Sequence, residues 1–345
     1  MESREVVRRA IRHQMPPRVP VVNLWVDWVK WAHERPREEV ERAQELMRGI
    51  PEDAIRMFYD PPAGWAPRKD LPADLIDDEW GVVWTRVSQR VVRHPLQEGW
   101  HEPVGFSWPD PDAPGRLDKA QAAKAANKEG RYFLGLVWFT LFERMWFMRG
   151  MENLLVDPLL DYESFKAFRD RMVEFNMRMI GHWLDLGVDG IFMSDDWGSQ
   201  RGLLINPADW RRLYKPCYKE MFDVIKAAGA DVWMHLCGDI SSIIPDLIEI
   251  GLDVYNPLQP QAVDIAWLKR EFGGHLCFNG GVDVQGTLPN GTPDEVDREV
   301  RMLISTLADK SGGYILGTSH TVLPDTPLAN LEAMVRAIGK YAGNG

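Results

Sequence analysis

The 345-residue sequence predicts an α/β protein, a (β/α)8 barrel with an irregular N-terminal elaboration. From residue 131 onward, short apolar runs alternate with helical stretches, which is typical of parallel strands covered on both faces. Polar residues stand where each apolar run stops, as expected at the mouth of a barrel that carries a site. A doubly wound open sheet is the alternative. No glycine-rich phosphate loop follows an apolar run, which weakens a dinucleotide-binding version of that fold.

The first 130 residues are the less regular part of the chain. Helical spacing and flanking prolines predict helices at residues 1–15, 37–48 and 117–129, and strands at 19–26 and within 52–60. The stretch 52–115 is rich in proline and has a β-like run at 81–87. We therefore expect one barrel domain, residues 1–345, with residues 61–130 as an irregular insertion within it.

The second part of the chain is regular. The expected strands are residues 132–140, 190–194, 232–237, 254–257, 275–279 and 313–317. The expected helices are residues 143–154, 162–186, 207–228, 241–250, 265–271, 293–308 and 328–341. With the two earlier strands this makes eight strand–helix units, the number in a (β/α)8 barrel.

Composition excludes several classes of protein. The net charge of -11 argues against a nucleic-acid partner and against an anionic membrane surface. No apolar run is long enough for a membrane helix, and the charged N-terminus lacks a secretory core. We expect a cytoplasmic protein that binds a small molecule. A homodimer is a reasonable expectation from the frequency of such assemblies alone.

The stretch 231–239 carries the strongest chemical signal. His235 and Cys237 are two residues apart at the end of an apolar run, so in a strand they face the same side. An imidazole and a thiol side by side can begin a zinc site, although two neighbouring core residues would look the same. His320 follows the last strand at the same level and is the preferred third ligand. Cys277 is the fallback, since it should lie one layer deeper in the barrel.

Other strand ends supply candidate binding and catalytic groups. Asp195 and Asp196 are adjacent, so only one can face the barrel axis, where it can orient a ligand, act as a base or complete a metal shell. The alternative is that one caps the following helix and the other is solvated. Glu143 either pairs on a helix surface or reaches the cavity. The residues expected to line the pocket are Trp25, Glu143, Asn256, Gln259, Asn279 and Asp283.

Tryptophan is abundant, with fifteen residues, and many of them crowd the N-terminal third. A broad ligand cavity lined by apolar side chains would use such residues, and the packing of irregular loops would use them too.

These strand ends resemble the uroporphyrinogen decarboxylase superfamily, which includes cobalamin-dependent methyltransferases that act with coenzyme M or other methyl acceptors. The similar segments are residues 138–141, 195–198, 206–210, 234–238, 279–283, 312–316, 320 and 324–327. They occur in the family's order over most of residues 130–340. The resemblance implies a (β/α)8 barrel with its site at the carboxyl ends of the strands.

The resemblance is closer to the methyltransferase-like branch. The decarboxylase branch has an arginine-rich motif near the N-terminus, whereas residues 22–28 contain no arginine. Its aspartate matches Asp60, but Pro61 and Pro62 follow where the family has isoleucine and leucine. A tetrapyrrole with many carboxylates would require several cationic partners. Decarboxylation of uroporphyrinogen is therefore not expected.

The methyltransferase branch binds zinc through a histidine, a cysteine two residues later and a distant cysteine. His235 and Cys237 match the first two, and the third position falls on His320, as in the decarboxylase branch. The resemblance thus implies a zinc enzyme that moves a methyl group between a small methylated substrate or thiol and a corrinoid on a partner protein, assisted by Asp195 or Asp196. One alternative is a metal-free decarboxylase with Asp60 and His320 as acid and base. Another is a non-catalytic barrel that binds a small molecule.

Overall fold

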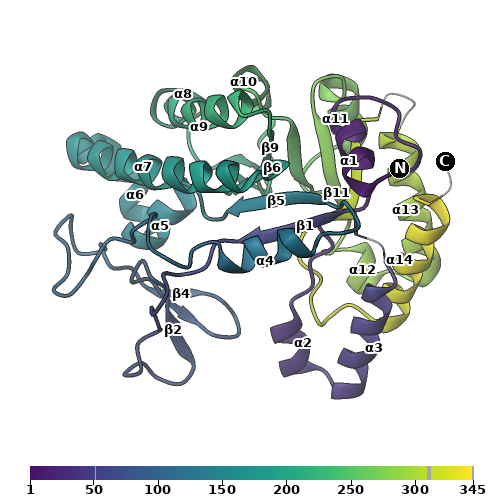
Figure 1. The fold of residues 1–345 in the computed structure, drawn as a ribbon, viewed down its shortest axis with the longest axis horizontal. Helices are drawn as coiled ribbons and strands as arrows, with labels where there is room; N and C mark the ends of the chain where they lie inside the picture. Colours follow the sequence, from purple (N-terminus) through teal and green to yellow (C-terminus); the bar gives the residue numbers. More distant parts are fainter. Residues whose placement is uncertain (51, 309–311, 344–345) are drawn as a thin grey trace.

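The computed structural model describes residues 1–50, 52–308 and 312–343. A parallel seven-stranded sheet curls through the centre of the protein with helices packed around it, which confirms the predicted α/β class (Figure 1). Its strands, in spatial order, are β1 (Ala54–Phe58), β5 (Tyr132–Val137), β6 (Gly190–Ser194), β9 (Asp231–His235), β10 (Val254–Leu258), β11 (Cys277–Val282) and β12 (Tyr314–Thr318). Because every neighbouring pair of these strands is parallel, all seven carboxyl ends lie at one mouth.

Residues 19–26 lie between β12 and β1 and complete the barrel without forming a regular strand. The Val22 N–H donates to the Leu316 carbonyl (2.9 Å), and the Asp53 N–H donates to the Val21 carbonyl (2.8 Å). Only isolated parallel bridges join this part of the described chain to β12 and the residues after it. The strand predicted at residues 19–26 therefore has the expected position in the barrel, but these residues do not form a continuous strand.

Two residues of this segment explain the broken pairing. Pro20 has no N–H to donate to a neighbouring strand. Asn23 has φ 68°, in the left-handed region, so the chain turns there instead of remaining extended. The same turn leaves the Asn23 side chain completely buried inside the barrel.

Helices follow the strands as predicted. In chain order they are α1 (Ser3–Ile11), α2 (Trp28–Glu34), α3 (Arg37–Arg48), α4 (Asp118–Ala126), α5 (Phe142–Arg149), α6 (Met151–Leu160), α7 (Tyr162–Leu186), α8 (Pro207–Leu213), α9 (Lys215–Ala227), α10 (Ile244–Ile250), α11 (Ile265–Phe272), α12 (Thr287–Asn290), α13 (Pro293–Leu307) and α14 (Leu328–Tyr341). The single helix expected at 143–154 is divided in two by Gly150, whose φ of 85° a helix cannot contain. The helix expected at 207–228 is likewise divided, at Tyr214.

Apolar side chains fill the barrel interior. Leu134, Phe192 and Trp233 belong to one buried cluster with Val7 and Ala10 of α1. The Ala10 carbonyl accepts a hydrogen bond from the residue before β12, at the amino ends of the strands. Helix α1 therefore covers the end of the barrel opposite the mouth.

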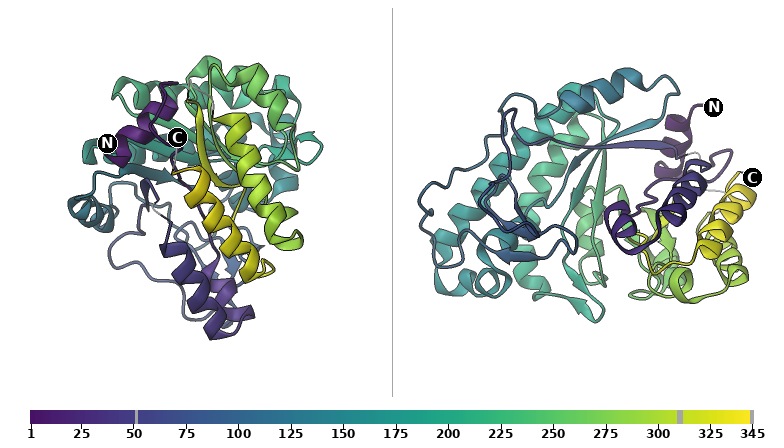
Figure 2. Two further views of the ribbon diagram at one scale, coloured as in Figure 1. Left: turned by 90° about the vertical axis from the view of Figure 1, so that its right-hand side faces the viewer. Right: turned by 90° about the horizontal axis from the view of Figure 1, so that it is seen from below.

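Two N-terminal parts lie at opposite ends of the molecule. Helix α3 packs against α14, while a small antiparallel sheet of β2 (Leu75–Asp77), β3 (Val83–Thr85) and β4 (Val91–Arg93) lies at the other end (Figure 2). Trp84 of β3 stacks on Phe139 (ring centroids 6.0 Å apart) and meets Phe147 edge-on (4.8 Å). These ring contacts hold the small sheet against the chain that leaves β5.

Among the described residues, no helix combines the length and the apolar character that crossing a membrane requires.

Candidate metal centre

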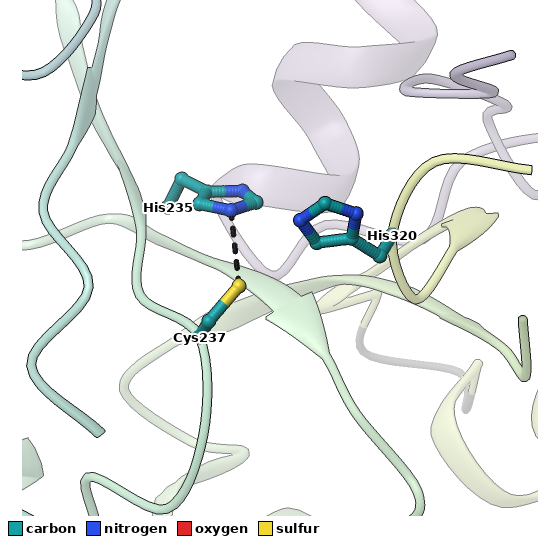
Figure 3. A group of neighbouring side chains, drawn as sticks. All are labelled: His235, Cys237 and His320. Atoms are coloured by element: carbon teal, nitrogen blue, oxygen red, sulfur yellow. Dashed lines mark hydrogen bonds between the residues drawn. The ribbon is translucent and has the colours of Figure 1, made fainter. Parts of the chain in front are cut away.

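Three predicted ligands meet at the mouth. His235 ends β9, Cys237 follows two residues later, and His320 follows β12 (Figure 3). One ligand atom from each lies within 4.8 Å of the others, and His235 Nε2 is 3.2 Å from Cys237 Sγ. Around a tetrahedral zinc ion, neighbouring nitrogen and sulfur ligands lie about 3.3–3.7 Å apart, so closing the set requires a movement of about 1 Å. Two imidazoles and a thiol are a donor set that zinc binds.

The loop that carries Cys237 is held by backbone contacts. Gly238 has φ 80°, and a Cβ there would lie 2.4 Å from the Gly198 carbonyl carbon. The Gly238 N–H donates to the side-chain oxygen of Gln259. The Cys237 N–H donates to Asp196 Oδ1 (2.9 Å). Glycine at 238 is therefore required for two loops to approach closely, and this approach sets the direction of the Cys237 side chain.

Asp195 and Asp196 have different surroundings. Asp195 is completely buried and accepts hydrogen bonds from the N–H groups of Leu141 (2.9 Å) and Glu143 (2.7 Å), where α5 begins. The Tyr218 hydroxyl donates to it as well (2.7 Å). Burial raises the pKa of Asp195 to about 7, against these hydrogen bonds. Asp195 thus holds the start of a helix, and Asp196 is the member of the pair that reaches the ligand cluster.

Asp196 and burial together affect the thiol. Asp196 Oδ1 lies 3.8 Å from His235 Nε2. Burial, and then the negative charge of Asp196, raise the pKa of Cys237 well above its ordinary value. A thiol in this environment is a poor nucleophile by itself, and a bound cation would reverse the effect of the negative surroundings.

Glu143 reaches the same region from α5. Its carboxyl group is buried and accepts a hydrogen bond from the Ser194 hydroxyl. Burial, and then the charges of Asp196 and Asp195, raise the pKa of Glu143 well above its ordinary value. The Glu143 carboxyl group therefore lies inside the protein, beside Ser194, and not on the helix surface.

His320 is the most exposed member of the cluster. The protein atoms that desolvate its ring, and then the nearby His235 (ring centroids 5.6 Å apart), lower the pKa of His320 to about 4. At neutral pH the imidazole is therefore unprotonated and has a lone pair for a cation.

Aromatic rings surround the cluster on the N-terminal side. The Trp138 ring lies 5.1 Å from His235 and 5.8 Å from Trp25, between ring centroids. Trp138 also lines a mostly apolar cavity of about 320 Å³. We call Trp25, Phe58, Tyr59, Trp65, Trp80 and Trp138 the aromatic wall; all but Trp25 line this cavity. The tryptophan content is compatible with such a wall and with loop packing alike, and Trp25 is the one residue of the wall among the expected pocket residues.

A larger cavity, about 820 Å³, lies among the loops of residues 62–110. Neither cavity is lined by a residue of the ligand cluster, but Trp138, whose ring lies 5.1 Å from that of His235, lines the smaller one. We therefore assign the smaller cavity to the site.

Asp60 is engaged elsewhere. Its carboxylate forms an ion pair with Lys119 of α4, whose side chain is 76% exposed. Its backbone N–H and carbonyl both bond to Arg116. The structure therefore does not pair Asp60 with His320 as acid and base.

The remaining candidates are buried among protein partners. Asp283 accepts from the Gln261 side chain (2.7 Å) and the Gln285 N–H (2.9 Å), so it holds a turn after β11. Asn256 and Asn279 are also buried and bonded to each other (2.8 Å). Cys277 belongs to the cluster inside the barrel, one layer below the mouth.

Known proteins match both the sequence and the fold. The uroporphyrinogen decarboxylase (URO-D) family matches residues 139–341. A methylated-thiol–coenzyme M methyltransferase of Methanosarcina mazei is 28% identical over 188 residues, 54% of this chain and 48% of that protein. A uroporphyrinogen decarboxylase of Chlorobaculum tepidum is 25% identical over 185 residues, 53% of this chain and 49% of that protein. The chain spans about half the length of these curated relatives.

The fold extends the match over the N-terminal part. A solved methyltransferase from Methanosarcina mazei superposes with a TM-score of 0.70 at 15% identity, covering 99% of both chains. The family match covers more than half of the sequence, and it contains all three residues of the ligand cluster. On this evidence the chain belongs to the uroporphyrinogen decarboxylase family.

Proposed function

We propose that this protein is a zinc-dependent, methyltransferase-like enzyme that moves a methyl group between a small methylated substrate or thiol and a corrinoid carried by a partner protein. The observation that supports it most is the cluster of His235, Cys237 and His320 at the carboxyl ends of β9 and β12. Barrel enzymes perform their chemistry at these ends, and three protein ligands with an open fourth position are typical of catalytic zinc. The corrinoid carrier is proposed from the family resemblance.

Each group at the mouth has a role in this reaction. Zinc, when bound, would hold a thiol as its thiolate or polarise a methylated oxygen or nitrogen. His235, Cys237 and His320 would hold the ion. Asp196 lies 3.8 Å from His235 Nε2, where its carboxylate can accept the proton of an incoming thiol.

The aromatic wall supports a small apolar substrate. Phe58 is 45% exposed at the mouth, and its ring lies 5.9 Å from that of Trp138. A cavity of about 320 Å³ is at the small end of ligand pockets. Rings of this kind exclude water and bind a methylated or aromatic group through apolar contact. We propose a compact methylated molecule that places its methyl group beyond Trp138, toward the cluster.

The alternative of a decarboxylase for a polycarboxylated substrate has less support. Arg56 forms an ion pair with Glu52 (2.8 Å), and Arg144 forms one with Asp78 (2.8 Å). These guanidinium groups beside the aromatic wall already carry counterions, whereas a tetrapyrrole with many carboxylates needs cations that are free to bind it. Asp60, which would serve as the acid or base, is held by Lys119.

A methyl-transfer assay tests the proposal. The zinc-loaded protein is mixed with methylcobalamin and a panel of small thiols, and the visible spectrum is followed. Transfer of CH3⁺ to the thiolate leaves both bonding electrons on cobalt, so cob(I)alamin and a thioether form together. We expect turnover in the wild type, its loss in Cys237→Ala, and its retention in the control Cys217→Ala, since Cys217 lies in α9. Metal-independent release of CO2 from a carboxylated substrate, without methyl transfer, would contradict the proposal.

A further inference from the structure

His235 presents its two ring nitrogens to different partners. Nε2 faces Cys237 Sγ at 3.2 Å, and Nδ1 lies 2.7 Å from Asn256 Oδ1. A neutral imidazole carries its proton on one nitrogen and a lone pair on the other. Which nitrogen holds the proton decides whether Nε2 can bind a cation directly. The buried neighbours of Asn256 answer this question.

Backbone carbonyls set the orientation of the Asn279 amide. Its Nδ2 lies 3.1 Å from the Val22 carbonyl oxygen and 3.1 Å from the Ile315 carbonyl oxygen. Carbonyl oxygens only accept hydrogen bonds, so the NH2 group must be on this side. In the opposite orientation Asn279 Oδ1 would face the two carbonyl oxygens, and both of these hydrogen bonds would be lost. Asn279 Oδ1 must therefore act as an acceptor.

The orientation passes from Asn279 to His235. Asn256 Nδ2 is 2.8 Å from Asn279 Oδ1, so Asn256 donates there and turns its own Oδ1 toward His235. An amide oxygen can only accept, and His235 Nδ1 must therefore carry the proton. Nε2 then has the lone pair, directed at Cys237.

An arginine orients the other end of the network. Asn23 Nδ2 also donates to Asn279 Oδ1, and Asn23 Oδ1 accepts from Arg56 Nη1 (3.1 Å). A guanidinium group only donates, so it requires an oxygen on this side of Asn23. Arg56 is itself held by Glu52 (2.8 Å). Two independent anchors, the carbonyls and Arg56, thus give the same orientation of the three buried amides.

We infer that Asn256, Asn279 and Asn23 form an amide relay whose role is to position a metal ligand: it keeps His235 in the tautomer with Nδ1–H and so presents an unprotonated Nε2 to a cation. The inference rests on the proposed metal site and adds the residues that prepare it before the ion arrives. Outer-sphere partners of ligating histidines commonly change metal affinity by about 10- to 100-fold. Asn256, which touches His235, should contribute most.

The first test reads the tautomer without any metal. Two-bond ¹H–¹⁵N spectra of ¹⁵N-histidine-labelled, metal-free protein separate a protonated from an unprotonated ring nitrogen. The His235 signals are assigned by their loss in His235→Gln. We expect a protonated Nδ1 and an unprotonated Nε2 in the wild type. A protonated Nε2 in the folded wild type would overturn the relay, whatever the enzyme's activity.

The second test separates positioning from mere packing. Asn256→Asp keeps an acceptor oxygen toward Nδ1, whereas Asn256→Leu removes it at similar volume. By chelator competition, Asn256→Leu should bind zinc about 10- to 100-fold more weakly. Asn256→Asp keeps the acceptor toward His235 Nδ1 and loses only the donor to Asn279 Oδ1, so its loss of affinity should be smaller. The control is Asn330→Leu, which removes another buried amide, one bonded to the Leu288 carbonyl (2.9 Å), and should not change zinc affinity.

Each contrary result has one meaning. Equal zinc affinity in Asn256→Leu, or equal losses in Asn256→Asp and Asn256→Leu, would overturn the positioning role. If the wild type binds no zinc, both the positioning role of the relay and the zinc-dependent function are contradicted. A wild type that has the expected tautomer and binds zinc, but transfers no methyl group, would leave the relay standing and contradict the proposed reaction alone.

Discussion

The ligand cluster and the aromatic wall face one mouth but are built differently. The cluster side is polar: His235 is 6% exposed, whereas His320 is exposed. A hydrogen bond to Asn256 and the close approach of the loops at Gly198 and Gly238 determine its geometry. The aromatic wall is held by ring contacts, with Phe58 45% exposed. Every residue of the wall precedes residue 139, where the family match begins, and every residue of the cluster follows it. Under the proposed function, we expect the chemistry to depend on the part after residue 139 and the choice of substrate on the part before it.

The largest expected effect comes from removing a cluster ligand. His235→Ala deletes a proposed metal ligand and leaves the wall intact, so we expect methyl transfer to fall by more than about 100-fold, beyond the usual loss from outer-sphere changes. Single-turnover rates at saturating substrate measure it. If His235→Ala binds zinc and keeps near-normal turnover, the chemistry does not depend on the ligand cluster as proposed.

A glycine in each region tests how tightly the backbone is packed. Gly238 and Gly64 both have positive φ, 80° and 86°, but a Cβ at Gly238 would meet Gly198 at 2.4 Å, whereas nothing lies within 4 Å of one at Gly64. Backbone strain alone costs about 1–2 kcal/mol. We expect Gly64→Ala to lose that much unfolding free energy in urea, and Gly238→Ala to lose about 3 kcal/mol or more. Equal losses would show that the close approach of the two loops is not rigid.

The wall should affect binding more than the chemical step. Phe58→Ala removes an exposed ring that contributes apolar contact, worth about 1–1.5 kcal/mol, which corresponds to about a 10-fold rise in KM. The zinc content and kcat should stay near the wild-type values. A fall in kcat with an unchanged KM would show that Phe58 acts in the chemical step, and the wall would then not be limited to substrate binding.

The smallest expected effect is a pH dependence of the unfolding free energy that comes from Glu299 of α13. Burial raises the pKa of Glu299 to about 7, and its carboxyl group accepts from the Asp283 N–H (3.1 Å) and the Thr287 hydroxyl (2.9 Å). The folded state therefore keeps this proton to higher pH than the unfolded chain, and its stabilisation is lost as pH rises from about 4.5 through 7. Urea unfolding at pH 5 and pH 7 should show a decrease in unfolding free energy that is smaller in Glu299→Gln by on the order of 1 kcal/mol. The decrease that remains comes from Asp195 and Glu143, whose pKa values are also raised. If Glu299→Gln loses as much unfolding free energy as the wild type between pH 5 and pH 7, a group other than Glu299 causes the decrease.

Much of this arrangement follows from the sequence because it depends on local pattern. The alternation of apolar runs and helices predicts the strands, and a parallel barrel then brings His235, Cys237 and His320 to one end. The neighbours Asp195 and Asp196 are different: identical residues at adjacent positions acquire opposite roles only through tertiary contacts, such as the Tyr218 hydroxyl.

The amide relay could not be predicted for the same reason. Asn23 and Asn279 are 256 residues apart in the chain, and an asparagine at a strand end looks the same whether it lines a pocket or is buried beneath one. The one local signal is Arg56, a charged residue in the middle of the apolar strand β1. A charge at such a position indicates a buried partner.

The metal content of the purified protein is the most direct test of the central claim. Protein prepared without chelators, then loaded with zinc and desalted, is measured by inductively coupled plasma mass spectrometry. The wild type and Phe58→Ala should each retain about one zinc per chain, because the wall takes no part in holding the ion. Cys237→Ala should retain almost none. A wild type without zinc after loading, or a Cys237→Ala variant that keeps a full equivalent, would contradict the account.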